Sequence, residues 1–426
     1  MAVGTPEQHF NVILDTGSAD FWLTDAQCTS SQCSGVALYN PGNSNSDTTS
    51  TTPFQITYGS GAVRGTLYAD TVSLAGYTVY NQTLAGVTQL AEGTLTSPTS
   101  GIMGMAFQTL ATSGATPFWE VLALSGTLGT PAFTFQLSRN SMASQSALNS
   151  GGTFTLGEID QNQYSGDITY TNLPNTQAGQ RGYWAIPLDS VNVNNNNVNT
   201  NGQLAAIDTG TTLIGAPSDV VQQIYANIQD STPVQSGSSG SAAYYAYPCS
   251  ANVDVSFTFS GRSFSMDAAD FNGGNVGTGN DGTPYCVGSI FATDLGTGAP
   301  DWIIGDSFLK NVFSVFESSP QRVGFANLKT AGVAQNAPVT LSVVPSGAAA
   351  NNVASTAAAT GASTTGGGVQ PPSAAANTQS ASNIIGGSGL PNPVPAGSAA
   401  GSTVSTFEEK MFIRWPIYSS VREPWR

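Results

Sequence analysis

The sequence predicts a mostly β protein built from two similar halves and followed by a long polar tail. From Phe10 to about Leu328, short apolar runs are broken by Gly, Asn and Pro, which is the pattern of strands joined by turns. One motif occurs twice within this region. After Leu328 the composition changes abruptly to Ala, Ser, Gly, Thr, Pro and Asn, with almost no aromatic or charged residues, so we expect the tail to be disordered.

The repeated motif is an apolar run that ends in Asp-Thr-Gly. Its first copy, VILDTGSADFW in 12–22, contains Asp15, and its second copy, LAAIDTGTTLIG in 204–215, contains Asp208, 193 residues later (208 − 15 = 193). A β-branched apolar run predicts a buried strand, so each aspartate lies where little water reaches it. A single Asp-Thr-Gly is weak evidence of function, whereas two copies behind similar strands predict a paired site.

A second repeat follows each aspartate at a similar distance. Gly101-Ile102-Met103-Gly104 ends 89 residues after Asp15 (104 − 15), and Trp302-Ile303-Ile304-Gly305 ends 97 residues after Asp208 (305 − 208). Because glycine has no side chain, the last residue of each motif allows a neighbouring segment to pass closely. We therefore expect an N-terminal lobe at 1–175, a C-terminal lobe at 176–330 and a low-complexity tail at 331–426.

Two carboxylates held close together have a specific chemical use. Ionising both carboxyl groups costs free energy because their like charges repel, so one of them keeps its proton. The charged carboxylate can then take a proton from a water molecule while the neutral one donates to a carbonyl oxygen, and peptide hydrolysis needs no Ser or Cys nucleophile and no metal.

The residues around each aspartate suit this task. Gly17 and Gly210 allow tight turns whose N–H groups point at the carboxylates. Thr16 and Thr209 can hydrogen-bond across the junction of the lobes, while Ser18 and Thr211 supply outer hydrogen bonds. Ordinary turn capping is the alternative explanation for these hydroxyls, and the duplication favours the paired site.

The segment 56–61, ITYGSG, alternates and carries glycines at its apex, so it predicts a mobile hairpin that closes over a substrate. Tyr58 in this hairpin could pack against substrate and reach Trp22. A surface hairpin with a core tyrosine is the alternative. His9 is the only histidine and is expected at the surface, where it cannot build a Ser-His-Asp or Cys-His site, so catalytic sites that need histidine are disfavoured.

Composition excludes several other classes of protein. The net charge is −15, with 26 acidic against 11 basic residues, which disfavours nucleic acid binding and is compatible with tolerance of low pH. The sequence contains no run of 18 or more apolar residues, so it predicts no membrane span. The four cysteines form two pairs, Cys28 with Cys33 and Cys249 with Cys286, which fit two local disulfides in an oxidising compartment; four free or metal-binding thiols are the alternative.

Three local features complete the prediction. Short helices are expected at 117–124 and 218–229, the second with Ser218 as its cap. The polar segment Asn192–Asn201 is expected to be the tip of a hairpin whose second strand carries Asp208. Asn81-Gln82-Thr83 is an N-glycosylation sequon, and the Ser/Thr/Pro-rich tail resembles a glycosylated stalk, although its charged end does not support a lipid anchor.

Taken together, the motifs resemble those of the pepsin-like aspartic proteases (family A1) of the secreted fungal type. The match covers about residues 3–328. It implies a bilobal, pseudo-two-fold β fold, a monomer outside the cell, and an extended peptide as the partner bound between the lobes, with no cofactor and no metal. By position, the resemblance assigns catalysis to Asp15 and Asp208, and substrate contacts to Tyr58, Gly59, Ser60, Gly17, Gly210, Thr211, Thr212, Ile13 and Ile102, with Thr16, Thr209, Ser18 and Trp22 in support.

The sequence also departs from the family pattern. Members usually carry a signal peptide, a propeptide and a further strand before the Gly4-Thr5-Pro6 segment, and this chain begins inside that region. We expect the loss of that strand to expose a sheet edge. Thr99 and Ser100 stand where an aromatic residue and an aspartate are usual, which predicts a smaller or more polar pocket wall.

The predicted function is an acid endopeptidase that cuts beside apolar residues. The alternatives are a catalytically inactive binding or cell-wall protein and an inactive truncated form.

Overall fold

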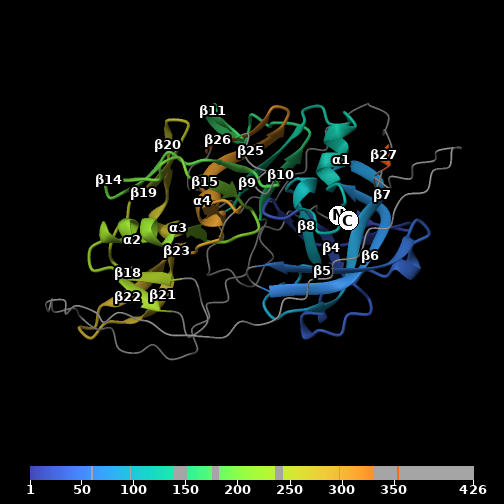
Figure 1. Ribbon diagram of the computed structural model, residues 1–426, viewed down its shortest axis with the longest axis horizontal. Helices are drawn as coiled ribbons and strands as arrows, with labels where there is room; N and C mark the ends of the chain where they lie inside the picture. The colour runs from blue at the N-terminus through green and yellow to red at the C-terminus, as the bar shows by residue number, and fades with distance from the viewer. Residues whose placement is uncertain are drawn as a thin grey trace, which may run out of the picture.

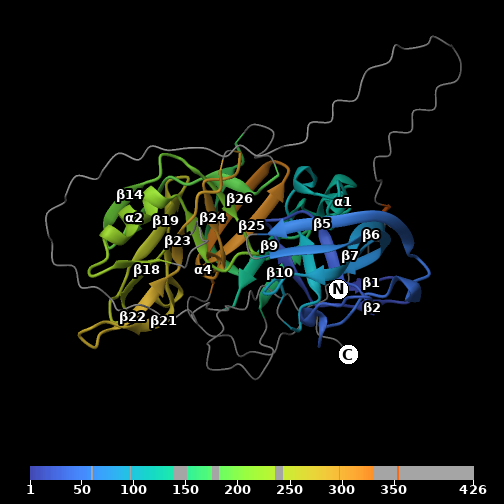
Figure 2. The ribbon, with the colours of Figure 1, turned by 60° about the horizontal axis from the view of Figure 1, so that its bottom comes forward.

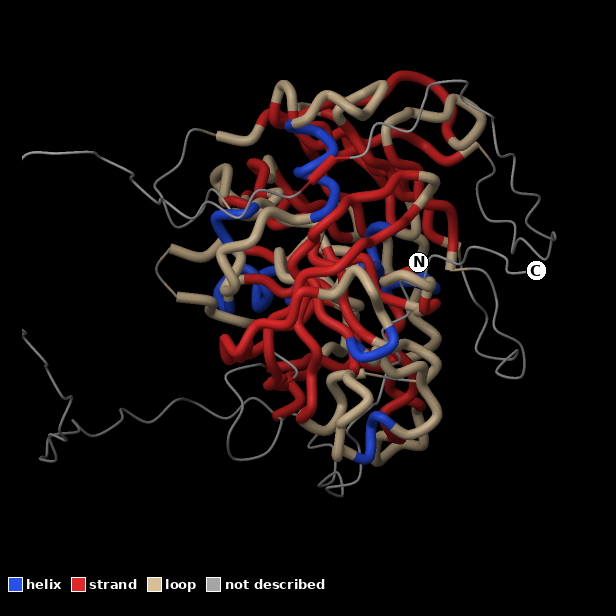
Figure 3. The backbone as a smooth tube through the Cα atoms, turned by 90° about the vertical axis from the view of Figure 1, so that its right-hand side faces the viewer, coloured by secondary structure: helices blue, strands red, loops and turns tan. Residues whose placement is uncertain are grey.

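The computed structural model describes residues 1–58, 61–95, 97–138, 151–174, 182–235, 243–296, 298–329 and 353–354. Strands dominate these residues and the helices are short, which confirms the mostly β fold class (Figure 3). The expected boundary between the lobes, near residue 175, and the expected tail from residue 331 lie outside the described residues, apart from Val353–Ala354. Both boundaries therefore stay predictions.

Except for β27, the first large sheet is built from about the first quarter of the chain (blue to teal in Figure 1). Its strands run in the order β2-β1-β6-β7-β4-β8-β3, with β5 paired to β6 and β27 to β7. Their bounds are β1 (Ala2–Val3), β2 (Gln8–His9), β3 (Val12–Asp15), β4 (Phe21–Thr24), β5 (Thr48–Tyr58), β6 (Gly61–Leu74), β7 (Tyr77–Leu90), β8 (Gly101–Gly104) and β27 (Val353–Ala354).

The second large sheet lies in the other half of the molecule (green to orange in Figure 1). Its order is β12-β15-β24-β16-β23-β18-β22-β21, with β17 paired to β18. The bounds are β12 (Ala185–Pro187), β15 (Leu204–Ile207), β16 (Ile214–Ala216), β17 (Thr232–Gln235), β18 (Ala243–Pro248), β21 (Asn272–Thr278), β22 (Pro284–Gly288), β23 (Ile290–Ala292) and β24 (Trp302–Ile304). A smaller sheet, β14-β13-β19-β20, comprises β13 (Ser190–Val193), β14 (Asn196–Asn199), β19 (Val255–Phe259) and β20 (Arg262–Met266).

A five-stranded antiparallel sheet joins the two halves, and Figure 2 shows its strands between the larger sheets. Its order is β10-β9-β25-β26-β11, with β9 (Ala132–Leu137), β10 (Gly152–Leu156), β11 (Tyr164–Asn172), β25 (Val312–Ser318) and β26 (Gln321–Leu328). Strands from the middle of the folded region therefore hydrogen-bond directly with the strands at its C-terminal end. Phe133 of β9 stacks on Phe316 of β25 with ring centroids 5.0 Å apart, and both belong to one apolar core that runs through both halves.

The helices are short. They are α1 (Phe118–Leu124), α2 (Ser218–Ala226), α3 (Ala268–Phe271) and α4 (Asp306–Leu309), with 3-10 turns at η1 (Ser31–Cys33), η2 (Pro41–Asn43) and η3 (Gln108–Leu110). Both expected helices are present, but the hydroxyl of Ser218 donates to Asp294 and does not cap α2. Within the described ranges, no helix is long and apolar enough to cross a membrane.

The hairpin expected at 192–201 forms, but the prediction of where it leads is wrong. β13 and β14 pair around Asn194 and Asn195, which both adopt positive φ, as a tight hairpin turn requires. The second strand of this hairpin, β14, ends at Asn199. The chain then turns at Asn201 and Gly202, which both adopt positive φ, and enters β15 at Leu204. Asp208 therefore follows a separate strand, because the polar residues after 199 turn the chain into the other sheet.

Candidate active site

Asp15 lies at the end of β3, whose four residues are all buried. Its carboxylate is only 6% exposed and accepts two hydrogen bonds from its own turn. The Gly17 N–H donates to Oδ1 at 2.8 Å, and the Ser18 hydroxyl donates to Oδ2 at 2.5 Å. The short turn after the strand therefore fixes the orientation of the carboxylate.

Asp208 directly follows β15 and has the same surroundings. It is 8% exposed, the Gly210 N–H donates to its Oδ1 at 2.8 Å, and the Thr211 hydroxyl donates to its Oδ2 at 2.7 Å. Each aspartate thus accepts one backbone and one hydroxyl hydrogen bond, from residues two and three positions further along the chain. The two turns are equivalent in sequence and in hydrogen bonding.

The two turns are tied together by their threonines. The Thr16 hydroxyl donates to the Ile207 carbonyl at 2.7 Å and accepts from the Thr209 N–H at 3.0 Å. Reciprocally, the Thr209 hydroxyl donates to the Leu14 carbonyl at 2.6 Å and accepts from the Thr16 N–H at 3.1 Å. Because both threonines are buried, these four bonds hold the ends of β3 and β15 in one arrangement.

Each carboxyl group packs against the glycine of the opposite turn. A Cβ atom added to Gly17 would lie 2.5 Å from the carboxyl carbon of Asp208, and one added to Gly210 would overlap the carboxyl of Asp15. Burial raises the pKa of Asp15 well above its ordinary value, and the negative charge of Asp208 raises it further. The hydrogen bonds from Ser18 and Gly17 act in the opposite direction without cancelling the effect. These surroundings favour the protonated form of Asp15 beside Asp208.

The strands beside each aspartate explain the second repeat. β3 pairs in parallel with β8 in a register that places Asp15 opposite Gly104. β15 pairs in the same way with β24, which ends one residue before Gly305. A Cβ atom on either glycine would collide with the backbone of the turn beyond the aspartate. The expectation that these glycines permit a close backbone approach is confirmed.

An apolar cluster lies beside Asp15. It contains buried Ile13, Trp22 and Ile102, with half-buried Tyr58 packed against them. The Trp22 Nε1–H donates to the Tyr58 hydroxyl at 2.7 Å, so the structure brings these two expected partners together. Burial, followed by the charge of Asp15, raises the pKa of Tyr58, which keeps its hydroxyl protonated. Gly59 and Ser60, the rest of the expected substrate-closing hairpin, lie outside the described residues.

Thr212 was expected to contact substrate. It is half-buried, and its carbonyl accepts hydrogen bonds from the N–H and the hydroxyl of Ser307, both at 2.9 Å. Its own Oγ1 is buried without a hydrogen-bond partner among the described residues. The backbone of Thr212 thus anchors the second turn to α4.

Sequence reasoning missed Asp306, the first residue of α4. It is 6% exposed, and its N–H donates to the Thr211 carbonyl at 2.8 Å. Burial raises its pKa well above the ordinary value; Lys310 opposes this effect, and the charges of Asp208 and Asp15 reinforce it. The available sequence signal was an aspartate directly after the second apolar-Gly repeat. Only the fold shows that this aspartate lies close enough to Asp15 and Asp208 for their charges to raise its pKa.

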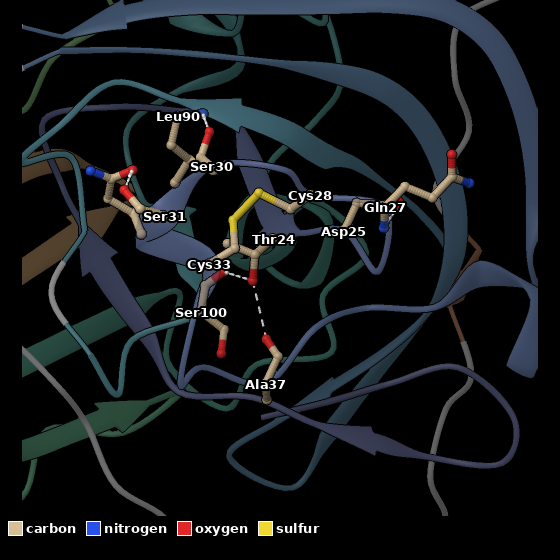
Figure 4. Close-up of a disulfide and its surroundings, with 11 residues drawn as sticks. Thr24, Asp25, Gln27, Cys28, Ser30, Ser31, Cys33, Ala37, Leu90 and Ser100 are labelled. Carbon is tan, nitrogen blue, oxygen red and sulfur yellow. Dashed lines mark hydrogen bonds between the residues drawn. A yellow bond between two sulfur atoms is a disulfide. The ribbon is translucent and has the colours of Figure 1, made fainter.

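Both disulfides favoured by the cysteine spacing are formed. Cys28–Cys33 closes the loop after β4 (Figure 4). Beneath this loop, the Thr24 hydroxyl contacts the carbonyl oxygens of Ala37 and Ser100, each at 3.1 Å. Cys249–Cys286 joins the end of β18 to β22 in the other half. Among the described residues, no group of three or more His, Cys, Asp or Glu side chains could hold a metal ion.

Comparison with known proteins identifies relatives of the whole folded region. A family model described as eukaryotic aspartyl protease matches residues 1–328. Major aspartyl peptidase 1 of Cryptococcus neoformans is 40% identical over 77% of this chain and 68% of its own length. An aspartic protease of Phaffia rhodozyma is 35% identical over 75% and 73%, and pepsin A of Suncus murinus is 31% identical over 76% and 79%.

Proposed function

The chain belongs to the eukaryotic aspartyl protease family and is an aspartic endopeptidase, and we propose that Asp15 and Asp208 form its catalytic pair. The observation that carries this proposal is the reciprocal packing of each carboxyl on the glycine of the opposite turn, which brings two buried acids together. Because the groups are coupled, the proton belongs to the pair and not to one residue.

The proposed reaction uses a water molecule between the carboxyl groups. The ionised carboxylate accepts a proton from this water as the water oxygen attacks the peptide carbonyl carbon, and the protonated carboxyl donates to the carbonyl oxygen. When the tetrahedral intermediate collapses, the C–N bond breaks and the carboxyl group that took the proton of the water donates it to the departing nitrogen. The other carboxylate takes a proton from a hydroxyl of the intermediate, so the pair still holds one proton. No nucleophilic side chain is required.

The surrounding hydrogen bonds support this chemistry by orienting the pair. Gly17 and Ser18 on one side, and Gly210 and Thr211 on the other, occupy carboxylate oxygens with donors from their own turns. Each carboxyl group is therefore held before substrate arrives, which lowers the reorganisation required during reaction.

We infer a preference for apolar residues at the cleavage site. Ile13, Ile102 and Trp22 form an apolar cluster beside Asp15, and half-buried Tyr58 packs against it. In this proposal the hairpin of β5 and β6 closes over an extended peptide, whose backbone contacts Gly59, Ser60, Gly17, Gly210, Thr211 and Thr212. Acidic conditions suit the pair because one proton must be retained.

We also propose that the protein acts outside the cell, as a monomer. Two disulfides are compatible with an oxidising compartment, and the only sequon in the sequence places Asn81 at an exposed position of β7. The Ser/Thr-rich composition after residue 331 is compatible with a stalk that tethers the enzyme to a cell wall.

The test is a casein or haemoglobin digest between about pH 3 and 5, with and without pepstatin. Asp15→Asn and Asp208→Asn should each reduce cleavage by about a thousandfold or more while the fold is kept, because general acid–base catalysis contributes that much. Asp219→Asn, at an exposed position of α2, is the control and should keep full activity. Full activity in either pair variant would overturn the mechanism. A folded wild-type chain that cleaves nothing would favour one of the two inactive alternatives, a truncated form or a binding protein.

A further inference from the structure

One edge of β7 is only partly covered by the first large sheet. β7 pairs with β6 along its whole length, but on its other side β4 pairs only with Ala85–Val87. The preceding residues, 77–83, therefore have an edge whose backbone N–H and C=O groups neither β6 nor β4 pairs with. Such an edge is a template for a further strand.

The sequence of this edge lacks the usual protection against strand addition. Residues 77–83, YTVYNQT, include no charged residue and no proline. Tyr80, in the middle of the edge, is one of the few exposed large apolar side chains among the described residues. Sheet edges that stay unpaired commonly carry charges or prolines, which block the approach of another strand. The edge of β7 therefore suits an extended peptide as its partner.

A segment of the chain's own tail lies on this edge. Val353–Ala354, which forms β27, pairs in parallel with β7, with Val353 opposite Val79 and Ala354 opposite Tyr80. Figure 1 shows β27 next to β7. Among the strands that the structure describes, only β6 also pairs with this part of β7.

The pairing with the tail ends where β7 bulges. The register between β6 and β7 shifts opposite Tyr80 and Asn81, and Asn81 adopts positive φ. A bulge interrupts the regular ladder of a sheet. Beyond it, the Gln82 side-chain amide donates to the carbonyl oxygens of Thr83 and Thr116, so the loop before α1 lies against β7. The edge available to the tail is therefore short and has a defined end, which restricts the register.

The sequence of the tail indicates why this segment is the one that pairs. Between Ser346 and Gly368 there is no proline and no charged residue, and Val353 is the only apolar residue larger than alanine. A β-branched valine favours the extended conformation. Val353 lies 25 residues after Leu328, the last residue of β26 (353 − 328 = 25). A chain of that length spans up to about 80 Å, so the connection is long enough to reach β7.

We propose that the open edge of β7 is a docking site for the tail, and that Val353 and Ala354 attach the tail to the first half as an added strand. The partner is thus an extended, uncharged segment of the same chain. Because residue 354 is held at β7, the rest of the tail starts from the first half and not from the five-stranded sheet, where β26 ends. Docking therefore determines the face of the enzyme from which any attachment through the tail is made.

The test is disulfide formation between cysteines introduced into the full chain. Tyr80→Cys is combined in turn with Ala354→Cys, its register partner, and with Ala348→Cys and Ala358→Cys as matched alanine controls in the tail. Paired residues of neighbouring strands lie about 5 Å apart, which is within the span of a disulfide. All four native cysteines are already in disulfides. The reactions are run at about pH 7, where thiols begin to ionise, with pepstatin and after removal of N-glycans, and the products are mapped by mass spectrometry.

The cysteine at position 80 should react with the cysteine at position 354 about tenfold faster, or more, than with either control, because docking raises the effective concentration of one register. The product should form within one chain, at a rate that does not depend on protein concentration. Equal rates for the three tail positions, or rates that change smoothly along the tail, would overturn the inference. A disulfide found only between two chains would also overturn it, because the tail would then pair with a second copy.

Two proline variants separate strand pairing from simple proximity. Val353→Pro should abolish the preference for position 354, because proline cannot donate to a ladder, whereas Ala358→Pro should leave it unchanged. If Val353→Pro keeps the preference, the tail is not held as a strand and the inference is wrong. Thr78→Cys with Asn352→Cys, the preceding register positions, gives the same test if Tyr80→Cys fails to fold. No cleavage is measured, so the proposed catalytic pair stands or fails separately.

Discussion

Replacing Thr16 by valine should strongly destabilise the protein although the two side chains have nearly the same shape. The change removes one acceptor and one donor, and leaves the Thr209 N–H and the Ile207 carbonyl without their present partner. Each buried polar group left unsatisfied costs about 1–3 kcal/mol, so the expected loss of unfolding free energy is about 2–6 kcal/mol. Thr209→Val should cost a similar amount, since it removes two equivalent bonds.

Urea unfolding followed by circular dichroism measures these losses. Thr153→Val, at a half-buried position of β10, is the control and should change stability by less than about 0.5 kcal/mol. The double variant of Thr16 and Thr209 should lose less than the sum of the single losses, because the two residues share one network. A loss below about 0.5 kcal/mol for both single variants would refute the view that these bonds hold the two turns together.

Three further predictions concern single groups. Burial raises the pKa of Asp25, so the folded state keeps this proton at pH values where the unfolded state loses it. The unfolding free energy should therefore fall as the pH rises above about 4. Asp25→Asn should make that fall less steep, and an unchanged slope would contradict the prediction. Trp22→Phe removes the hydrogen bond to Tyr58 and should lower kcat/KM of the folded enzyme about tenfold. Because Trp22 is buried, the smaller ring should also lower the unfolding free energy; equal activity would show that the bond does not position the tyrosine. Replacing Cys249 and Cys286 by serine opens a loop with a sequence separation of 37 and should lower the unfolding free energy, measured with urea, by about 4 kcal/mol. No measurable loss would contradict this prediction.

The sequence was sufficient to predict the mostly β fold class and the closeness of the two Asp-Thr-Gly turns, because these depend on local patterns that occur twice. Apolar runs of three and four residues predict β3 and β15, and the turn residues that follow predict the hydrogen bonds to Asp15 and Asp208. The repeated pattern carries this information without any knowledge of which strands pair.

Features that depend on strand pairing could not be predicted in the same way. The pairing of Gly215 with Phe291, for example, depends on the register between β16 and β23, and no local motif predicts it. Asp306 is buried because α4 packs against the second turn. The path after Asn199 was predicted wrongly because polar turn residues indicate where a chain turns but not which sheet it enters next.

The reciprocal glycine contacts restrict how this sequence can vary over time. A single added methyl group on Gly17 would displace the carboxyl of Asp208, and one on Gly210 would displace that of Asp15. A substitution in one half is therefore felt first by the acid that the other half supplies. Although the two copies of the motif lie far apart in the chain, they cannot diverge independently, and selection on one acts directly on the other.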